Sequence, residues 1–157
     1  IFDTLNAKAA LYAINEIKEE RKIDLPVMVS GTITDASGRT LSGQTVEAFR
    51  ISMSHIPILS IGFNCALGAD QLLPYVKRLA NQSDLFVSAH PNAGLPNAFG
   101  AYDQSPEEMQ TLIEDYLKQN AVNIIGGCCG TTPDHIRLIA EVAKKYTPRN
   151  PKQLSNV

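Results

Sequence analysis

Four short apolar runs, each followed by a helical pattern, constrain the fold of this chain more than any other feature. Each run is nearly continuous in apolar residues, as buried parallel strands tend to be. The predicted strands are 27–31, 58–63, 85–89 and 122–126. Helices are predicted after them at about 45–54, 69–80, 106–120 and 133–146. Strands that alternate with helices in this way indicate an α/β fold built from βα units.

A further helix precedes the first strand and ends near Lys22. Asp3 and Thr4 form its N-cap signal. The helix has an apolar stripe that consists of Leu5, Ala9, Tyr12, Ala13 and Ile17. Two later helices are predicted to begin with a capping residue and a proline, at 105–106 and 132–133.

The connections after the strands are long and rich in special residues, whereas those after the helices are short. The long ones include 31–44 and 90–104. A parallel sheet that elaborates only the loops at the carboxyl ends of its strands is built to place a site there. The three cysteines, Cys65, Cys128 and Cys129, lie in such loops or at their edge. We therefore expect them to converge at one end of the sheet.

The cysteines suggest a metal site with one position left open. Neighbouring residues of a regular strand point to opposite faces, so Cys128 and Cys129 must lie where their strand ends. The glycines around the pair permit a backbone that turns both sulfurs inward. Three thiolates suit a zinc ion whose fourth position takes water or substrate. Inert buried thiols remain the alternative, because the pair lacks CxxC spacing, and a disulfide is disfavoured by the strain of linking adjacent cysteines.

Composition excludes some classes of function and leaves the architecture open between two possibilities. The net charge of the 157 residues is -2, and no basic patch with interleaved aromatic residues suggests a nucleic acid partner. No apolar run is long enough to span a membrane. The chain begins with Ile1 and has no signal-like segment, so we expect it to belong to a longer polypeptide. Four βα units fit half of an eightfold barrel, and a complete five-stranded doubly wound domain also fits this length.

Five segments resemble the homocysteine-binding domain of cobalamin-dependent methionine synthases. They are IFDTLNAKAAL at 1–11, VMVSGTITDASGRTLSGQT at 27–45, GFNCALGAD at 62–70, HPNAGLPNAFGAYD at 90–103 and NIIGGCCGTTPDHI at 123–136. The last segment, with an upstream Asn-Cys pair, is typical of homocysteine methyltransferases in general. The second and fourth segments favour the cobalamin-dependent branch.

The resemblance implies the C-terminal half of a (βα)8 TIM barrel, with strands five to eight and their flanking helices in residues 1–147. Residues 148–157 would begin a linker to a folate-binding domain. Zn²⁺ would be held by Cys65 after the sixth strand and by Cys128 and Cys129 after the eighth, with homocysteine as the substrate. Methylcobalamin, bound by another module of the same polypeptide, would supply the methyl group that gives methionine. The resemblance also implies a cytoplasmic methyltransferase, an acidic residue before Ile1 that binds the substrate amine, and no activity of this fragment alone.

Five further residues are candidates for binding substrate. Asn64 and Asn92 follow strand ends near the cysteines and could hold homocysteine or fill the fourth zinc position in its absence. Asp3, Gly31 and Thr32 could receive the amino acid head group. Capping and turn formation are the alternative roles of all five.

The three histidines are expected outside the metal site. His90 is interpreted as a hydrogen-bonding group of its loop in preference to a fourth zinc ligand. His55 and His135 are interpreted as surface or capping residues.

Two other functions remain open at this point. One is a methyltransferase of the same superfamily that takes its methyl group from betaine or S-methylmethionine. The other, from a different class, is a non-catalytic zinc module or a thiol redox protein.

Overall fold

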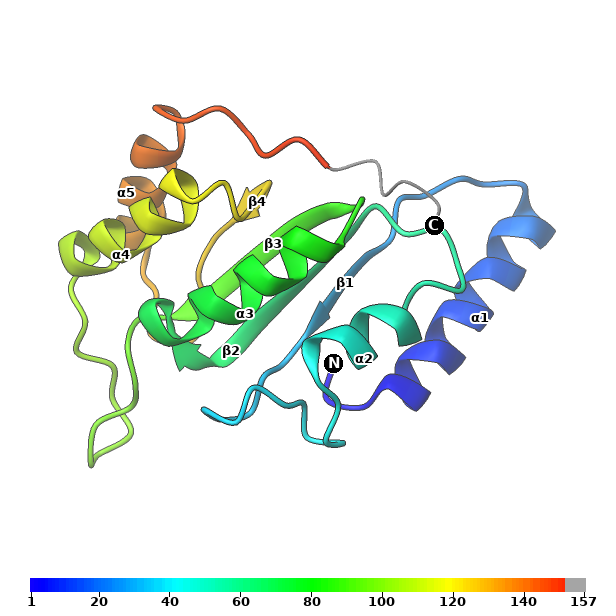
Figure 1. Ribbon diagram of the computed structural model, residues 1–157, viewed down its shortest axis with the longest axis horizontal. Coiled ribbons are helices and arrows are strands. Elements are labelled where there is room, and N and C mark those ends of the chain that lie inside the picture. The colour runs from blue at the N-terminus through cyan, green and yellow to red at the C-terminus, as the bar shows by residue number, and fades with distance from the viewer. Residues whose placement is uncertain (152–157) are drawn as a thin grey trace.

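The computed structural model describes residues 1–151 and contains one parallel four-stranded sheet with helices packed on it (Figure 1). In chain order the elements are α1 (Thr4–Arg21), β1 (Met28–Gly31), α2 (Val46–Ser52), β2 (Ser60–Gly68), α3 (Ala69–Gln82), β3 (Phe86–Asn92), α4 (Pro106–Lys118), β4 (Ile124–Ile125) and α5 (Pro133–Ala143). The strands pair in the order β1-β2-β3-β4. This order lacks the reversal of a doubly wound sheet, so the predicted α/β fold is confirmed as an arrangement consistent with part of a (βα)8 barrel.

One face of the sheet packs against the helices. Val29, Ile61 and Val87 lie side by side in register and are buried, and α3 lies across β2 and β3 (Figure 1). Phe63 is fully buried and meets Phe49 of α2 with ring centroids 5.3 Å apart. The core therefore lies between the sheet and the helices that follow its strands.

The opposite face of the sheet is only partly covered by the described residues. Met28 and Phe86 flank Ser60 in register, and they are 50% and 41% exposed. Leu59 lines a shallow groove with Phe86 and is 38% exposed. These exposed apolar side chains at the amino-terminal end of the sheet indicate that it packs against something further.

The predicted start of α1 at Asp3 is confirmed, and its apolar stripe is exposed within the described residues. Asp3 accepts hydrogen bonds from the amides of Leu5 and Asn6. The buried residues of the helix are Thr4, Ala7 and Leu11, while the predicted Leu5 is 73% exposed. Apolar residues occur on more than one side of this helix, and the pattern alone could not show which side meets α2.

The predicted strand ends differ from the observed ones, whereas the helix ends agree within three residues. β2 continues beyond Phe63 to Gly68, and β3 beyond Ala89 to Asn92. These extensions pair with each other, which a single-strand pattern does not reveal. β4 is shorter than predicted because only Ile124 and Ile125 form a regular ladder with β3. None of the helices in residues 1–151 combines the length and the apolar composition needed to cross a lipid bilayer.

Arg149 anchors the segment after α5 to the amino-terminal end of the sheet. Its side chain is buried, and its guanidinium donates hydrogen bonds to the carbonyls of Ala80, Ser83 and Leu85 and to Asn123 Oδ1. The carbonyls near the end of α3 thereby gain a charged partner. The predicted linker at 148–157 begins with this packed segment, and from residue 152 it lies outside the described residues. The boundary at residue 147 stays a prediction.

Replacing Arg149 by alanine is expected to lower the free energy of unfolding by about 2–4 kcal/mol, because the buried carbonyls lose their donors. Urea unfolding of the full-length polypeptide measures the loss. Arg137→Ala is the matched control, since that side chain is 56% exposed and pairs only with residues of its own helix. It should leave the stability nearly unchanged. Equal losses in the two variants would contradict the anchoring role of Arg149.

Candidate metal centre

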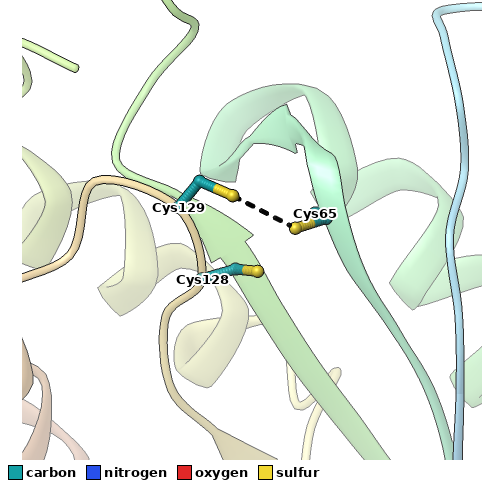
Figure 2. A group of neighbouring side chains, drawn as sticks. All are labelled: Cys65, Cys128 and Cys129. Carbon is teal, nitrogen blue, oxygen red and sulfur yellow. Dashed lines mark hydrogen bonds between the residues drawn. The ribbon is translucent and has the colours of Figure 1, made fainter. Parts of the chain in front are cut away.

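The three cysteine sulfurs meet at the carboxyl end of the sheet (Figure 2). All three Sγ atoms lie within 4.8 Å of one another, and Cys65 Sγ is 3.5 Å from Cys129 Sγ. Cys65 and Cys128 are half-buried, and Cys129 is exposed. The predicted convergence of the cysteines is therefore confirmed, and solvent reaches the cluster from the side of Cys129.

Cys65 is aimed at the cluster by a bulge in β2. The strand pairs regularly with β3 up to Asn64 opposite His90, and pairing resumes at Gly68 opposite Asn92. Three residues of β2 thus lie opposite one residue of β3. Within the bulge, Cys65 and Ala66 have φ values of 59° and 55°, a left-handed conformation that costs roughly 1–2 kcal/mol per residue. Such bulges re-aim side chains and are frequent beside functional sites.

Cys128 and Cys129 are held by hydrogen bonds to the end of β3. The Cys128 amide donates to Pro91 O at 2.8 Å, and the Cys129 amide donates to Asn92 Oδ1 at 3.1 Å. Cys129 O in turn accepts from the Ala93 amide at 2.9 Å. The adjacent cysteines therefore lie beyond the regular part of β4, as predicted, and β3 fixes their backbone.

A tight turn at 128–131 carries the chain away from the pair. Cys128 O accepts hydrogen bonds from the Thr131 amide at 3.2 Å and from Thr131 Oγ1 at 2.7 Å. Gly130 occupies the third position with φ 77°, where the turn requires a left-handed residue. On the other side of the pair, a Cβ atom added to Gly126 would lie 2.8 Å from the His90 ring. These glycines allow the backbone to bend and to pass close to its neighbours.

The sulfurs influence one another's protonation. Burial acts to raise the pKa of Cys65, but hydrogen bonds from Cys128, Cys129, Asn64 and the Ala66 amide outweigh it and lower that pKa. Burial raises the pKa of Cys128 to about 12, with further contributions from the hydrogen bond and the charge of Cys65. Cys65 therefore loses its proton well before Cys128.

The spacing of the sulfurs fits a metal ion of the size of zinc. Zinc–sulfur bonds of about 2.3 Å in a tetrahedral site place two sulfurs about 3.8 Å apart. The separation of 3.5 Å between Cys65 and Cys129, and the upper bound of 4.8 Å for the group, need only small side-chain adjustments to match. The cluster could therefore bind a metal through three sulfurs. His90 does not belong to this cluster, and burial lowers its pKa.

Two of the predicted substrate residues, Asn64 and Asn92, lie beside the cysteines. They were expected just after strand ends, but they lie within strands. Asn64 is next to Cys65 in β2, and its Oδ1 accepts a hydrogen bond from Ser30 Oγ at 2.6 Å. Asn92 is the last residue of β3, is 2% exposed and contacts the Cys129 amide. The long pairing of β2 with β3 places them there.

The other three predicted substrate residues make capping and packing contacts. Asp3 caps α1. Gly31 ends β1 under the ring of Phe49, where an added Cβ would lie 2.8 Å from the ring carbons. Thr32 is buried, and its amide donates to Ile1 O at 2.9 Å. Their role in binding substrate stays a prediction.

His135 was predicted as a surface or capping residue, and it caps α5 from a buried position. It is 4% exposed, its Nδ1 lies 2.9 Å from Thr132 Oγ1, and its Nε2 lies 2.9 Å from Gln104 O. The place three residues after Thr132, where a capping box has its second partner, is the sequence signal for this role. His55 is exposed, as predicted, with Nδ1 3.0 Å from Ser52 O.

Tyr102 is a residue near the cluster that the sequence analysis missed. It is half-buried and packs over Gly130, the residue after Cys129. Burial, followed by the neighbouring cysteines and their negative charge, raises the pKa of Tyr102. Its only sequence signal is its place in the long loop after β3, at the same end of the sheet as the cysteines.

Comparison with known proteins agrees with this fold and identifies a family. Residues 1–143 match the family described as homocysteine S-methyltransferase. Two similar solved structures are the homocysteine methyltransferase MmuM from Escherichia coli in its metallated form, with 23% identity and a TM-score of 0.57, and in its apo form, with 21% identity and a TM-score of 0.55. The matches cover 83% and 84% of this chain, but only 40% and 45% of those chains. At these identities the likeness establishes the fold, whereas the family match spans nearly all of the sequence. The chain therefore belongs to the homocysteine S-methyltransferase family.

Proposed function

We propose that this chain is the C-terminal half of the homocysteine-binding barrel of a cobalamin-dependent methionine synthase. The observation that carries the proposal is the convergence of three thiol sulfurs, from two separate strand ends, within 4.8 Å. Methylation of homocysteine is the chemistry of the family to which the chain belongs. In this proposal the four strands are the fifth to eighth of the barrel, and residues 148–157 lead toward a folate-binding module.

Cys65, Cys128 and Cys129 would hold Zn²⁺ as three thiolates and leave one position open for the homocysteine sulfur. Bound there, zinc would keep that sulfur deprotonated near neutral pH and reactive as a thiolate. The bulge of β2 and the hydrogen bonds to β3 support this role, because they fix the backbone from which the three side chains extend. Preorganised ligands of this kind lose little flexibility on binding.

Five residues are proposed to receive the rest of homocysteine. Asn64 and Asn92 adjoin the cysteines, so they could contact the substrate or occupy the fourth zinc position without it. Asp3, Gly31 and Thr32 lie at the end of β1 or at the start of α1 and are proposed for the amino acid head group.

Methylcobalamin, held by another module of the same polypeptide, is the proposed methyl donor. The homocysteine sulfur forms a bond to the methyl carbon, and the electron pair of the bond that breaks stays with the donor. The proposal rests on the resemblance of 27–45 and 90–103 to the cobalamin-dependent branch. The exposed side of the cluster at Cys129 is compatible with a bulky donor that approaches from solvent.

The test compares three methyl donors with the full-length, zinc-loaded polypeptide. Methionine should form from homocysteine and methylcobalamin, and only at background level with betaine or S-methylmethionine. A preference for either of the last two would replace this proposal with the other branch of the superfamily. Zinc binding without any homocysteine binding would favour the non-catalytic zinc or thiol module instead.

A further inference from the structure

The loop between β3 and α4 projects beyond the carboxyl end of the sheet, where the cysteine cluster lies (Figure 1). Both ends of this loop are attached to the chain around the cysteine pair. At the first end, the Ala93 amide donates to Cys129 O at 2.9 Å. At the second end, Gln104 O lies 2.9 Å from Nε2 of the buried His135, which caps α5. The loop is therefore held beside the most exposed of the three cysteines.

The tip of the loop is a turn that hydrogen bonds keep in one conformation. Asn97 Oδ1 accepts from the amide of Phe99 at 2.9 Å and from the amide of Ala101 at 3.0 Å. The Asn97 amide donates to Ala101 O at 2.8 Å, and Asn97 Nδ2 donates to Asp103 Oδ2 at 2.7 Å. The side chain of Phe99 takes no part in this network and is 96% exposed. The turn thus presents the Phe99 ring to solvent on a fixed backbone.

Phe99 belongs to an uncharged apolar surface at the loop tip. Among the described residues it is the most exposed large apolar side chain, and Leu95 is 50% exposed. The smaller exposed members of this surface are Pro96, Ala98 and Ala101. Residues 91–102 contain no charged side chain. Single exposed apolar side chains are common, but a group of them on a rigid, uncharged loop indicates an interaction surface.

The first half of the proposed barrel would join the sheet away from this loop. β3 pairs with β2 on one side and with β4 on the other, so the open edges of the sheet are β1 and β4. Further strands of a barrel would pair at those two edges. The loop tip after β3 is therefore expected to stay exposed when the barrel is complete.

We propose that the loop tip at 95–101 is the docking surface for the donor-carrying module of the same polypeptide, with Phe99 as its main contact. The inference rests on the proposed function. The methyl carbon must reach a sulfur at the open position of the metal, so the donor module has to cover the carboxyl end of the sheet, where this tip projects. A rigid aromatic side chain that is buried on docking contributes a large apolar contact and loses little flexibility.

Phe99→Ala in the full-length, zinc-loaded polypeptide tests this role, because loss of an exposed ring leaves the barrel intact. The rate of methyl transfer from bound methylcobalamin to homocysteine, followed by cobalamin absorbance in a single turnover, should fall about tenfold or more. The homocysteine affinity, measured by calorimetry, should stay at the wild-type value. Ile51→Ala is the matched control, since Ile51 is 62% exposed near the end of α2, toward the amino-terminal end of the sheet. It should change neither quantity.

The outcomes separate this inference from the proposed function. A wild-type transfer rate in Phe99→Ala would overturn the inference while the metal site and its chemistry stand. Equal falls in the transfer rate and the homocysteine affinity would assign the loop to the substrate and also overturn it. A lower urea midpoint in Phe99→Ala than in Ile51→Ala would show that the ring packs inside the complete barrel, with the same consequence. A wild-type polypeptide that forms no methionine from methylcobalamin would overturn the proposed function, and the inference with it.

Discussion

Replacing Cys65 by alanine is expected to lower the zinc affinity of the full-length polypeptide a hundredfold or more. Structural zinc sites with four ligands have apparent binding free energies of about 10–16 kcal/mol, so one ligand accounts for roughly 2.5–4 kcal/mol. The loss should be at least that large here, because Cys65 is the only cysteine of the cluster that comes from β2. Without it the metal keeps only the adjacent pair, Cys128 and Cys129.

Chelator competition measures the zinc affinity, and isothermal calorimetry with homocysteine measures the second consequence. If homocysteine binds through the metal, its affinity should fall together with that of zinc. The melting temperature of the metal-free protein serves as the control for folding, and it should not fall in Cys65→Ala. Alanine at position 65 has the same energetic cost in the left-handed conformation, with φ 59°, as cysteine, so the substitution adds no backbone strain. Zinc affinity within a few-fold of wild type would show that Cys65 is not a ligand.

The sheet and the gathering of the cysteines could be predicted because both depend on patterns that repeat along the chain. Apolar runs that alternate with helical patterns give parallel strands, and long loops after the strands place Cys65 and the pair at 128–129 at one end. The glycines around the cysteine pair also indicated a turn there, since glycine is the residue that the third position of the turn at 128–131 requires.

The bulge in β2 could not be predicted, because Cys65 and Ala66 are left-handed without being glycine. Neither residue type favours a left-handed conformation. The pairing of β2 with β3 on both sides of the bulge offsets its energetic cost, and this pairing is visible only in the structure. Tyr102 and Arg149 were missed for a related reason. Each contacts residues far away in sequence, Tyr102 at Gly130 and Arg149 at the end of α3.

Strand β3 positions the three sulfurs in two ways, by strand pairing on one side and by hydrogen bonds on the other. On one side, β3 pairs with β2 and so fixes the bulge that aims Cys65. On the other side, Pro91 and Asn92 of β3 accept hydrogen bonds from the amides of the cysteine pair. The central strand therefore sets the distance between the two halves of the cluster.

The isolated 157 residues are expected to lack a cooperative unfolding transition and to associate in solution. The sheet face away from the helices exposes half of Met28 and much of Phe86 and Leu59, and α1 exposes Leu5 and Tyr12. Burying one large apolar side chain contributes about 1.5–3 kcal/mol, so this uncovered surface withholds an amount comparable with the total stability of a domain, about 5–15 kcal/mol. Strands β1 and β4 also form open edges of the sheet within residues 1–151.

A substitution with different effects in the full-length polypeptide and in the isolated chain tests whether this face is the inside of a barrel. Phe86→Ser should cost about 3–5 kcal/mol in the full-length polypeptide, where the proposed first half of the barrel covers the ring. In the isolated chain, which is expected to lack a sharp transition, it should reduce association, because the ring is 41% exposed there. Leu41→Ser is the matched control, since Leu41 is 72% exposed in a loop and should be neutral in both contexts. Urea unfolding and sedimentation provide the measurements. A monomeric isolated chain with one sharp transition would contradict the half-barrel proposal, because an uncovered sheet face and two open edges are incompatible with such behaviour.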